Sequence, residues 1–198
     1  MTLYTGKGDD GTTKTFGCDQ RISKSSEVAE ALGALDEINS FLGLIKVKAK
    51  SLRNDGSDIS DSKPVDISIL GKGFDEIAEE VQQNLFIIQA EVAGSNMTIS
   101  EEKLRECEGY VNEAEKLLPP IKTFFVSGGT ELATLCDISR TIARRAERRV
   151  VAIVDNNQGV HVGEWTLAYL NRLSSLLYAM ARLANHYMGI LEDAPSYK

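Results

Sequence analysis

The sequence has few cysteines and histidines and no long apolar run, and each of these shortages excludes a class of protein. Its three cysteines, Cys18, Cys107 and Cys136, are widely spaced and odd in number, which argues against a disulfide framework or a four-ligand zinc site. The two histidines, His161 and His186, lack the Glu-x-x-His spacing of di-iron bundles, and no His-Glu-x-x-His motif is present. No segment is apolar over the roughly 20 residues that span a bilayer. We therefore expect a soluble protein with incidental thiols, no metal site and no association with membranes.

The first residues bear on the cellular compartment, and the net charge bears on the class of ligand. The first ten residues have neither the apolar segment of a signal peptide nor the arginine- and serine-rich character of a transit peptide, so we expect a cytoplasmic protein. The formal net charge of −7 opposes general binding of nucleic acids, because a duplex needs an extended basic surface. There is no nucleophile elbow and no cysteine paired by motif with a histidine. An enzyme of this kind would rely on positioning and electrostatics, letting one substrate attack the other.

Apolar residues at three- or four-residue spacing predict five helices within a single domain, residues 1–198. The helices are expected from Ser23, with Ser23 or Ser25 as N-cap, then over 67–93, from Ser100 to Pro119, from Gly129 to Val154, and over 163–188. Residues 51–64 are polar and rich in helix breakers, which predicts a flexible connection, and residues 1–22 form an ordered loop or a disordered tail. No strand–helix alternation is present. The predicted fold class is all-α, a ferritin-like up-and-down bundle of five helices.

Five of the ten arginines fall within residues 140–149. At about 100° per residue, a helix places Arg140, Arg144, Glu147 and Arg148 on one face and turns Arg145 and Arg149 away from it. Like charges one turn apart repel, so this ridge costs stability unless an anion or a set of carboxylates faces it. A small anionic ligand fits this requirement, and the alternative is a solvated basic face.

Three further groups carry weaker signals. The amino-terminal residues mix glycines, hydroxyls and lysines that can present N–H groups and cations to phosphate, although a solvated terminus has the same composition. Asn171 and Arg172 interrupt the last apolar helix, so at least one should face a polar partner, with an ordinary interhelical hydrogen bond as the alternative. Asp36 follows a core position, and three interpretations are open for it: an acid of the first helical turn, a surface charge, or the carboxylate that the arginine ridge needs.

Five motifs occur together and in order along nearly the whole chain. They are Tyr-Thr-Gly-Lys-Gly-Asp-Asp-Gly-Thr-Thr, Gly-Ala-Leu-Asp-Glu-Ile-Asn-Ser, Phe-Val-Ser-Gly-Gly-Thr, Arg-Thr-Ile-Ala-Arg-Arg-Ala-Glu-Arg and Asn-Arg-Leu-Ser. With them the sequence resembles the PduO-type corrinoid adenosyltransferases, which use ATP and cob(I)alamin. The resemblance implies a five-helix bundle that forms a homotrimer, with ATP and the corrinoid meeting at subunit interfaces. The implied reaction moves the 5′-deoxyadenosyl group of ATP to cobalt and releases triphosphate, with Co(I) as the nucleophile and Mg²⁺ sharing the phosphate charge.

The resemblance also implies roles for individual residues. One subunit would wrap ATP with Thr5, Gly6, Lys7, Gly8, Thr13, Lys14 and Lys24, and its neighbour would hold it with Arg144, Arg145, Glu147, Arg148 and Asn171. Asp36 and Arg140 would form an intersubunit ion pair that shapes the site. Phe124 would line the corrinoid pocket, where an apolar side chain displaces the lower axial ligand and leaves four-coordinate cobalt. A corrinoid reductase and an adenosylcobalamin-dependent enzyme are the implied partners.

The sequence departs from the family pattern at four positions. Ser127 stands in place of a proline, Ser175 in place of an aspartate, and Val28 and Leu32 in place of an arginine and a tyrosine. These changes bear on corrinoid affinity and local rigidity more than on the ATP site. Two other functions fit the residues: a module that binds ATP or a corrinoid without catalysis, and an all-α scaffold whose arginines form only oligomer salt bridges.

Overall fold

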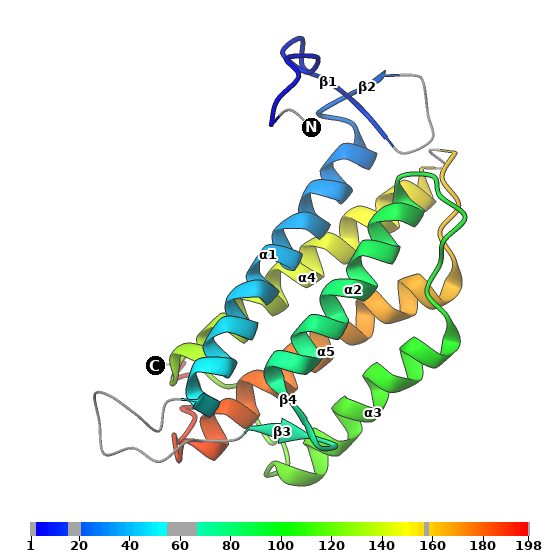
Figure 1. Ribbon diagram of the computed structural model, residues 1–198. Coiled ribbons are helices and arrows are strands. Elements are labelled where there is room, and N and C mark those ends of the chain that lie inside the picture. The colour runs from blue at the N-terminus through cyan, green and yellow to red at the C-terminus, as the bar shows by residue number, and fades with distance from the viewer. Residues whose placement is uncertain (1–2, 16–20, 55–66, 157–158, 198) are drawn as a thin grey trace.

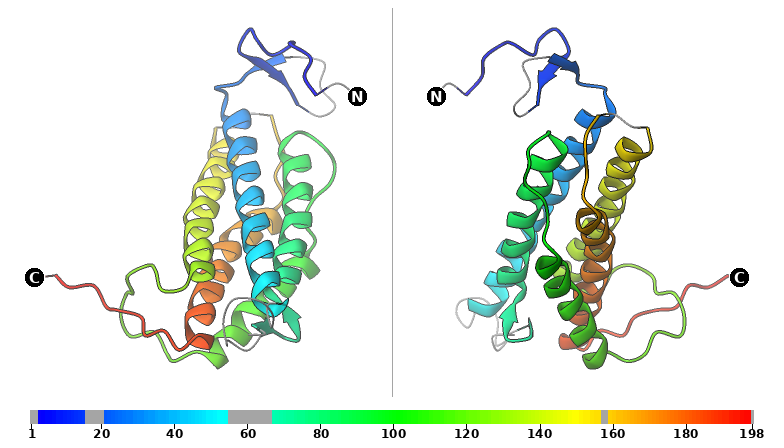
Figure 2. Two further views of the ribbon diagram at one scale, coloured as in Figure 1. Left: turned by 60° about the vertical axis from the view of Figure 1, so that its left-hand side comes forward. Right: turned by 90° about the vertical axis from the view of Figure 1, so that its right-hand side faces the viewer.

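The computed structural model describes residues 3–15, 21–54, 67–156 and 159–197 of the chain. The described residues contain the five expected helices: α1 (Glu27–Asn54), α2 (Phe74–Val92), α3 (Glu101–Leu117), α4 (Glu131–Asp155) and α5 (Glu164–Tyr187). α1 packs between α2 and α4, and α5 packs between α4 and α3, with successive helices running in alternating directions (Figure 1, Figure 2). The prediction of an all-α bundle is therefore confirmed.

Two short antiparallel hairpins were not predicted. β1 (Thr12–Lys14) pairs with β2 (Arg21–Ser23) in the register Thr13 to Ile22, so part of the amino-terminal segment is a strand and not only a loop or tail. β3 (Ser68–Ile69) pairs with β4 (Lys72–Gly73), so the prediction of a helix from residue 67 is wrong over its first seven positions. Leu70 and Gly71 have φ angles of 53° and 76°, and this left-handed turn cannot continue an α-helix.

Other helix boundaries follow from local caps. The hydroxyl of Ser26 accepts a hydrogen bond from the Ala29 N–H at 3.3 Å, so α1 is capped by Ser26 and the prediction of Ser23 or Ser25 is wrong. The predicted cap Ser100 is confirmed, since its hydroxyl accepts from the Lys103 N–H at 3.4 Å. α1 extends to Asn54, so the predicted connection cannot begin at residue 51, and residues 55–64 lie outside the described ranges.

The core is one cluster of apolar side chains contributed by all five helices. Predicted core positions on α1 and α5 are fully buried, among them Leu35, Leu42 and Leu173, whereas Val28 and Leu32 are only partly buried. Tyr169 is the largest fully buried side chain, and its hydroxyl accepts a hydrogen bond from the Asn84 amide at 3.1 Å. Among the described residues no helix is long and apolar enough to cross a membrane.

Burial of two cysteines leads to a prediction about their reactivity. Burial raises the pKa of the Cys107 thiol to about 12 and raises that of Cys136 as well, so neither forms thiolate near neutral pH. Iodoacetamide at pH 8 should leave both thiols unmodified in the folded protein and alkylate both after denaturation in guanidinium chloride, as read by peptide mass spectrometry. Alkylation of Cys136 at the same rate in both states would contradict this. Cys18 lies outside the described ranges.

Candidate functional site

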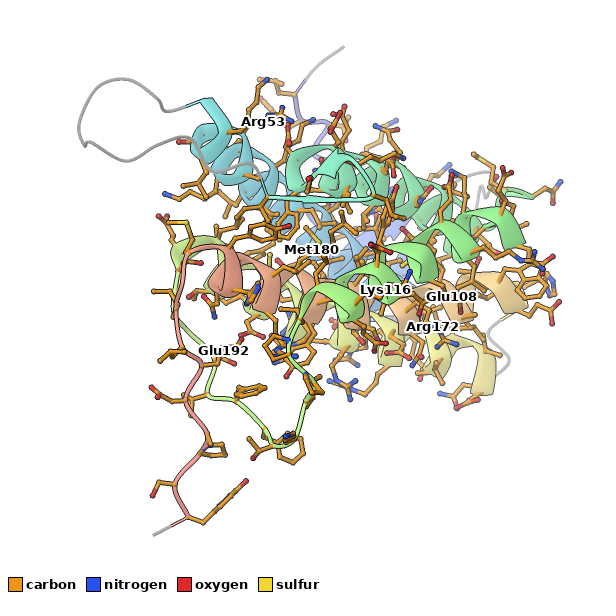
Figure 3. All side chains as sticks on the ribbon, turned by 90° about the horizontal axis from the view of Figure 1, so that it is seen from below. Arg53, Glu108, Lys116, Arg172, Met180 and Glu192 are labelled. Carbon is orange, nitrogen blue, oxygen red and sulfur yellow. The ribbon has the colours of Figure 1, made fainter. Side chains whose placement is uncertain are left out.

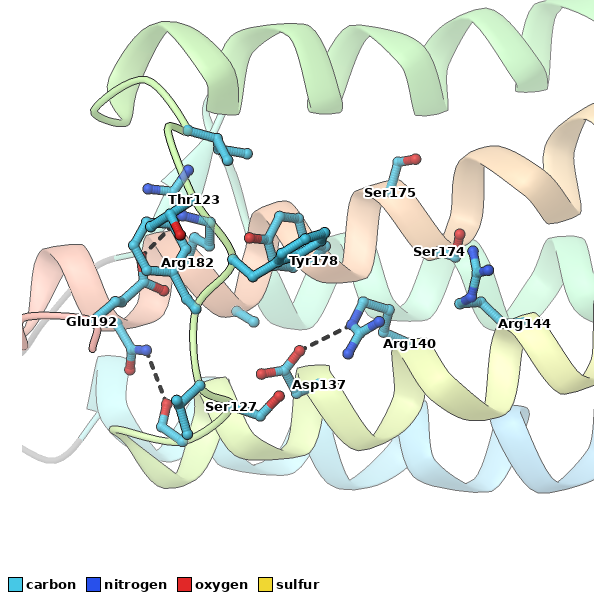
Figure 4. Close-up of a pocket in the computed structure, with 17 residues that line it drawn as sticks. Thr123, Ser127, Asp137, Arg140, Arg144, Ser174, Ser175, Tyr178, Arg182 and Glu192 are labelled. Atoms are coloured by element: carbon cyan, nitrogen blue, oxygen red, sulfur yellow. Dashed lines mark hydrogen bonds and ion pairs between the residues drawn. The ribbon is translucent and has the colours of Figure 1, made fainter. Parts of the chain in front are cut away.

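A cavity of about 550 Å³ opens between α4, α5, the α3–α4 loop and the carboxy-terminal segment. Its wall combines aromatic side chains with cations, as the close-up in Figure 4 shows. Three predicted site residues, Phe124, Arg140 and Arg144, line it together. Ser127 and Ser175, the two departures from the family pattern on these elements, line it as well. The sequence-based site is thus partly assembled within a single chain.

The loop that carries Phe124 is anchored at several points. The amide of Asn185 accepts a hydrogen bond from the Thr130 N–H at 2.9 Å and donates to the Gly128 carbonyl, also at 2.9 Å. The Val126 N–H donates to the Asp193 carbonyl at 2.8 Å, which joins the loop to the carboxy-terminal segment. With the loop backbone fixed, the Phe124 side chain stays 79% exposed at the cavity. Ile121 and Val126 on the same loop are also exposed and line the cavity, and a group of exposed apolar side chains is typical of a binding surface.

An ion pair between a buried arginine and a half-buried glutamate lies in the wall of this cavity. The Arg182 guanidinium donates to the Glu192 carboxylate at 3.0 Å and to the Pro119 carbonyl at 3.3 Å, and it lies 4.9 Å from the centre of the Phe125 ring. Arg182 is 5% exposed, so its charge depends on these partners for compensation. Sequence reasoning missed Arg182, Asn185 and Glu192. The signal for the first two was present, because both are polar residues within the apolar stripe of α5.

Arg140 is paired within its own helix. Its guanidinium Nε lies 3.0 Å from a carboxylate oxygen of Asp137, one turn earlier on α4, and its Cζ lies 5.9 Å from the Tyr178 ring centre. Burial is the largest effect on the pKa of Tyr178 and raises it, so the phenol stays neutral near pH 7. The carboxylate of Asp36, on α1, is exposed and makes no polar contact within the described ranges. The two members of the expected intersubunit pair are therefore not joined within one chain.

The other four arginines of the cluster divide by helix face, as helical geometry predicted. Arg145 pairs with Glu37 and Arg149 with Glu30, both on α1 and on the opposite side from the cavity. Arg144 and Arg148 are exposed and have no hydrogen-bond or ion-pair partner among the described residues. Glu147, on the same face, accepts a hydrogen bond from the Asn171 amide at 2.9 Å. α4 therefore presents two unneutralised guanidinium groups beside an oriented carboxamide.

The amino-terminal candidates form a compact turn structure. Gly6 and Gly11 adopt left-handed φ angles of 67° and 78°, which allow hydrogen bonds from the Asp9 N–H to the Gly6 carbonyl and from the Gly11 N–H to the Gly8 carbonyl, both at 3.2 Å. Lys24 braces this turn by donating to the Gly8 carbonyl at 2.8 Å. The predicted residues Thr5, Gly6, Lys7, Gly8, Thr13, Lys14 and Lys24 therefore gather in or beside the first hairpin.

Arg21 holds the two strands together and was not predicted. Its guanidinium donates to the Thr12 hydroxyl at 2.5 Å and to the Thr12 carbonyl at 2.9 Å, and it also donates to the Lys7 carbonyl. Hydrogen bonds from Thr12 lower the pKa of Asp10 below its usual value. The hairpin stands beyond one end of the bundle, whereas the cavity lies toward the other end (Figure 1, Figure 2). Within one chain the two candidate regions cannot enclose the same small ligand.

The sequence matches one protein family and several of its characterised members. The family model for cobalamin adenosyltransferase matches residues 3–184. The chain is 34% identical over 193 residues to the corrinoid adenosyltransferase PduO of Citrobacter freundii, covering 94% of this chain and 50% of that protein. It is also 34% identical over 197 residues to the corrinoid adenosyltransferase of Bacillus subtilis, covering 96% of this chain and 90% of that protein. The chain thus spans about half the length of the PduO relatives it matches.

A solved structure has the same fold. It is a variant of the PduO-type ATP:corrinoid adenosyltransferase from Lactobacillus reuteri, complexed with cobalamin and ATP. The two chains share 26% sequence identity and superpose with a TM-score of 0.82, over 99% of this chain and 97% of the other.

The anchoring of the α3–α4 loop predicts that Gly129 cannot be replaced. A Cβ atom at Gly129, where φ is 97°, would lie 2.3 Å from the Asn185 amide oxygen. Gly129→Ala should lower the free energy of unfolding by about 1–3 kcal/mol, measured by urea denaturation. Gly109→Ala on α3 is the matched control, since its Cβ would meet nothing closer than 3.8 Å and should be neutral or stabilising. Equal stability of the two variants would contradict the anchoring role of Asn185.

Proposed function

Because this chain belongs to the cobalamin adenosyltransferase family, we propose that it transfers the 5′-deoxyadenosyl group of ATP to the cobalt of cob(I)alamin and releases triphosphate. One observation carries the proposal: the Arg144 guanidinium, which has no partner among the described residues, and the exposed aromatic ring of Phe124 line the same cavity. The first suits a polyanion and the second suits the apolar face of a large planar ligand.

The chemistry needs no nucleophile from the protein. The electron pair of Co(I) forms the cobalt–carbon bond at C5′ of ATP, the C5′–O bond breaks, and triphosphate leaves with the electron pair of the broken C5′–O bond. Arg144 and Arg148, which have no carboxylate partner in the described parts of the chain, would stabilise the charge that develops on the leaving group. The protein's contribution is then positioning and electrostatics.

Magnesium fits this site only together with the nucleotide. Within the described residues no group of three histidine, cysteine or carboxylate side chains could hold a metal ion. Mg²⁺ commonly binds through substrate phosphates, waters and one or two protein oxygens, and the Glu147 carboxylate and the Asn171 carboxamide lie together on the proposed ATP face. When bound, Mg²⁺ would neutralise part of the phosphate charge.

The corrinoid side of the proposal depends on the α3–α4 loop. Phe124 would stand at the lower face of the corrin ring and displace the axial ligand, leaving four-coordinate cobalt. The two carboxylates in the cavity wall, Asp137 and Glu192, are both engaged by arginines, so the wall does not oppose an apolar ligand with free negative charge. Ser127 and Ser175 lie in this wall, and their effect is therefore expected on corrinoid affinity.

We propose a homotrimer in which adjacent subunits complete the ATP site. The position of the hairpin supports this arrangement, because the hairpin stands beyond one end of the bundle (Figure 1), whereas Arg144 lines the cavity between α4 and α5. The ATP-binding residues of one subunit would then face Arg144, Glu147, Arg148 and Asn171 of the next, and they are Thr5, Gly6, Lys7, Gly8, Thr13, Lys14 and Lys24. Arg145 pairs with Glu37 on α1 and would reach ATP only if that pair opened. Asp36 would reach Arg140 across the interface, competing with Asp137 or sharing the guanidinium with it. Residues 1–198 act as a single domain in this arrangement.

The cellular setting follows from the same chemistry. Cys107 and Cys136 are free thiols, which supports a reducing compartment such as the cytoplasm. Co(I) has to be supplied by a corrinoid reductase, and the product is a cofactor for an adenosylcobalamin-dependent enzyme. Both are proposed as partners in the reaction sequence.

A direct assay tests the activity. The protein is mixed anaerobically with ATP, Mg²⁺ and chemically reduced cobalamin, and adenosylcobalamin is followed by its absorbance while triphosphate is separated by ion exchange. Equal amounts of both products are expected. Formation no faster than in the mixture without protein sinks the proposal, and ATP binding without turnover would favour a non-catalytic binding module.

The unpaired guanidinium of Arg144 gives a sharper prediction. Arg144→Ala should lower kcat/KM by about 100-fold or more, because stabilisation of the leaving group is lost in the transition state. Arg149→Ala is the matched control on the same helix, since Arg149 pairs with Glu30 away from the cavity and its loss should change kcat/KM by less than about threefold. Circular dichroism and the subunit stoichiometry of both variants should match the unmodified protein. Unfolding of Arg144→Ala would instead assign this arginine a structural role.

A further inference from the structure

A chain of polar contacts runs across three helices beside the unpaired arginines. The Glu108 carboxylate, on α3, accepts a hydrogen bond from Arg172 Nε, on α5, at 2.9 Å. Arg172 Nη1 donates to the Asn171 amide oxygen at 2.8 Å, and the Asn171 amide nitrogen donates to Glu147, on α4, at 2.9 Å. Figure 3 shows Glu108 and Arg172 meeting between α3 and α5. This series of contacts therefore links α3, which carries none of the proposed ATP ligands, to Asn171 and Glu147, which are proposed to bind ATP.

The contact from Arg172 decides which way the Asn171 amide points. The oxygen and nitrogen of a carboxamide have nearly the same shape, so packing alone does not distinguish its two orientations. Arg172 can only donate, and it therefore draws the amide oxygen toward itself and turns the amide nitrogen toward the Glu147 carboxylate. In the opposite orientation the amide oxygen would face the carboxylate, and two acceptors would repel each other.

Glu108 in turn holds Arg172 in the geometry that this requires. A guanidinium has five donors in a rigid plane, so one arginine can serve a carboxylate through Nε and an amide oxygen through Nη1 at the same time. The two side chains are 42% and 36% exposed, so the pair adds little stability on its own and its effect is on orientation. The other Glu147 oxygen and the other amide hydrogen of Asn171 have no partner in the described ranges, so both are available to the proposed ligand.

We propose that Arg172, held by Glu108, is a positioning residue that fixes the Asn171–Glu147 pair in the orientation that binds ATP. This inference rests on the proposed function, in which Asn171 and Glu147 contact the nucleotide. It extends the ATP site from α4 and α5 to the outer helix α3. It also distinguishes Arg172 from Arg144 and Arg148, which have no partner in the described parts of the chain and would meet phosphate directly.

Binding of ATP in the presence of Mg²⁺, measured by isothermal titration calorimetry on the assembled protein, tests the role of Arg172. Arg172→Met keeps the length of the side chain and removes its donors, and it should weaken ATP binding about threefold to tenfold, the loss expected for one hydrogen bond. Arg105→Met is the matched control, because the ion-pair partner of Arg105 in the described ranges is Glu101 on its own helix, and its removal makes the same change in net charge. Its ATP affinity should be unchanged. Equal affinity of Arg172→Met and the unmodified protein overturns the proposal.

A double-mutant cycle separates positioning from direct contact. If Arg172 acts through Asn171, then Arg172→Met should cause no further loss of ATP affinity in an Asn171→Ala background. The same loss in both backgrounds overturns the proposal, because Arg172 would then act on ATP itself. Glu108→Gln provides a second variant that leaves α5 intact, and it should weaken ATP binding about twofold or more. Unchanged affinity of Glu108→Gln would also contradict the proposal.

Turnover of the unmodified protein, measured in parallel, keeps the two hypotheses apart. Absence of adenosylcobalamin with normal ATP binding and non-additive variants contradicts the proposed function and supports the positioning role. Normal turnover with additive losses contradicts only the positioning role. Thermal unfolding of each variant, followed by circular dichroism, confirms that the comparisons are made on folded protein.

Discussion

Repulsion between positive charges stacked along α4 is the constraint on which the site depends. Arg140, Arg144 and Arg148 follow one another at one-turn spacing, and only Arg140 is neutralised within the described chain, by Asp137. The opposite side of the helix is buried through Ala143, Ala146 and Val150 together with the rest of the core cluster. Packing of that side outweighs repulsion of a few tenths of a kcal/mol per pair. The helix thus remains rigid while it presents charge that a bound polyanion would neutralise.

The last helix connects the polar and apolar parts of the site. Asn171 and Arg172 lie beside the arginine face, and Arg182 and Asn185 hold the loop that carries Phe124. Arg182 follows Asn171 by eleven positions, which corresponds to about 16 Å along a helix. Because both pairs belong to one continuous helix packed in the core, the distance between the phosphate-binding and apolar regions is set by α5 and not by a flexible loop.

Much of the fold was predictable from the sequence, because long amphipathic helices repeat their apolar residues over many turns. The two hairpins were missed since strands of two or three residues are too short to show a period, and the second depends on a left-handed turn at Leu70. The division of the arginines by face followed from helical geometry alone. Their partners differ in predictability: Asp137 lies one turn from Arg140, whereas Glu37 is 108 positions from Arg145 and needs the tertiary fold. The partners of Arg182 also need the tertiary fold, because Glu192 and Phe125 reach it from irregular segments.

The internal hydrogen bonds of the amino-terminal hairpin affect the thermodynamics of ligand binding. Arg21 and Lys24 tie the turn around Gly6–Gly11 to the second strand and the residues after it, so its backbone is ordered by contacts within the hairpin itself. A phosphate chain that binds there would immobilise the backbone of few further residues, each of which costs about 1–2 kcal/mol when it is fixed from a disordered state. The conformational entropy of the amino-terminal hairpin is therefore lost during folding. When an anion binds, less of the favourable binding enthalpy is offset by ordering of the backbone.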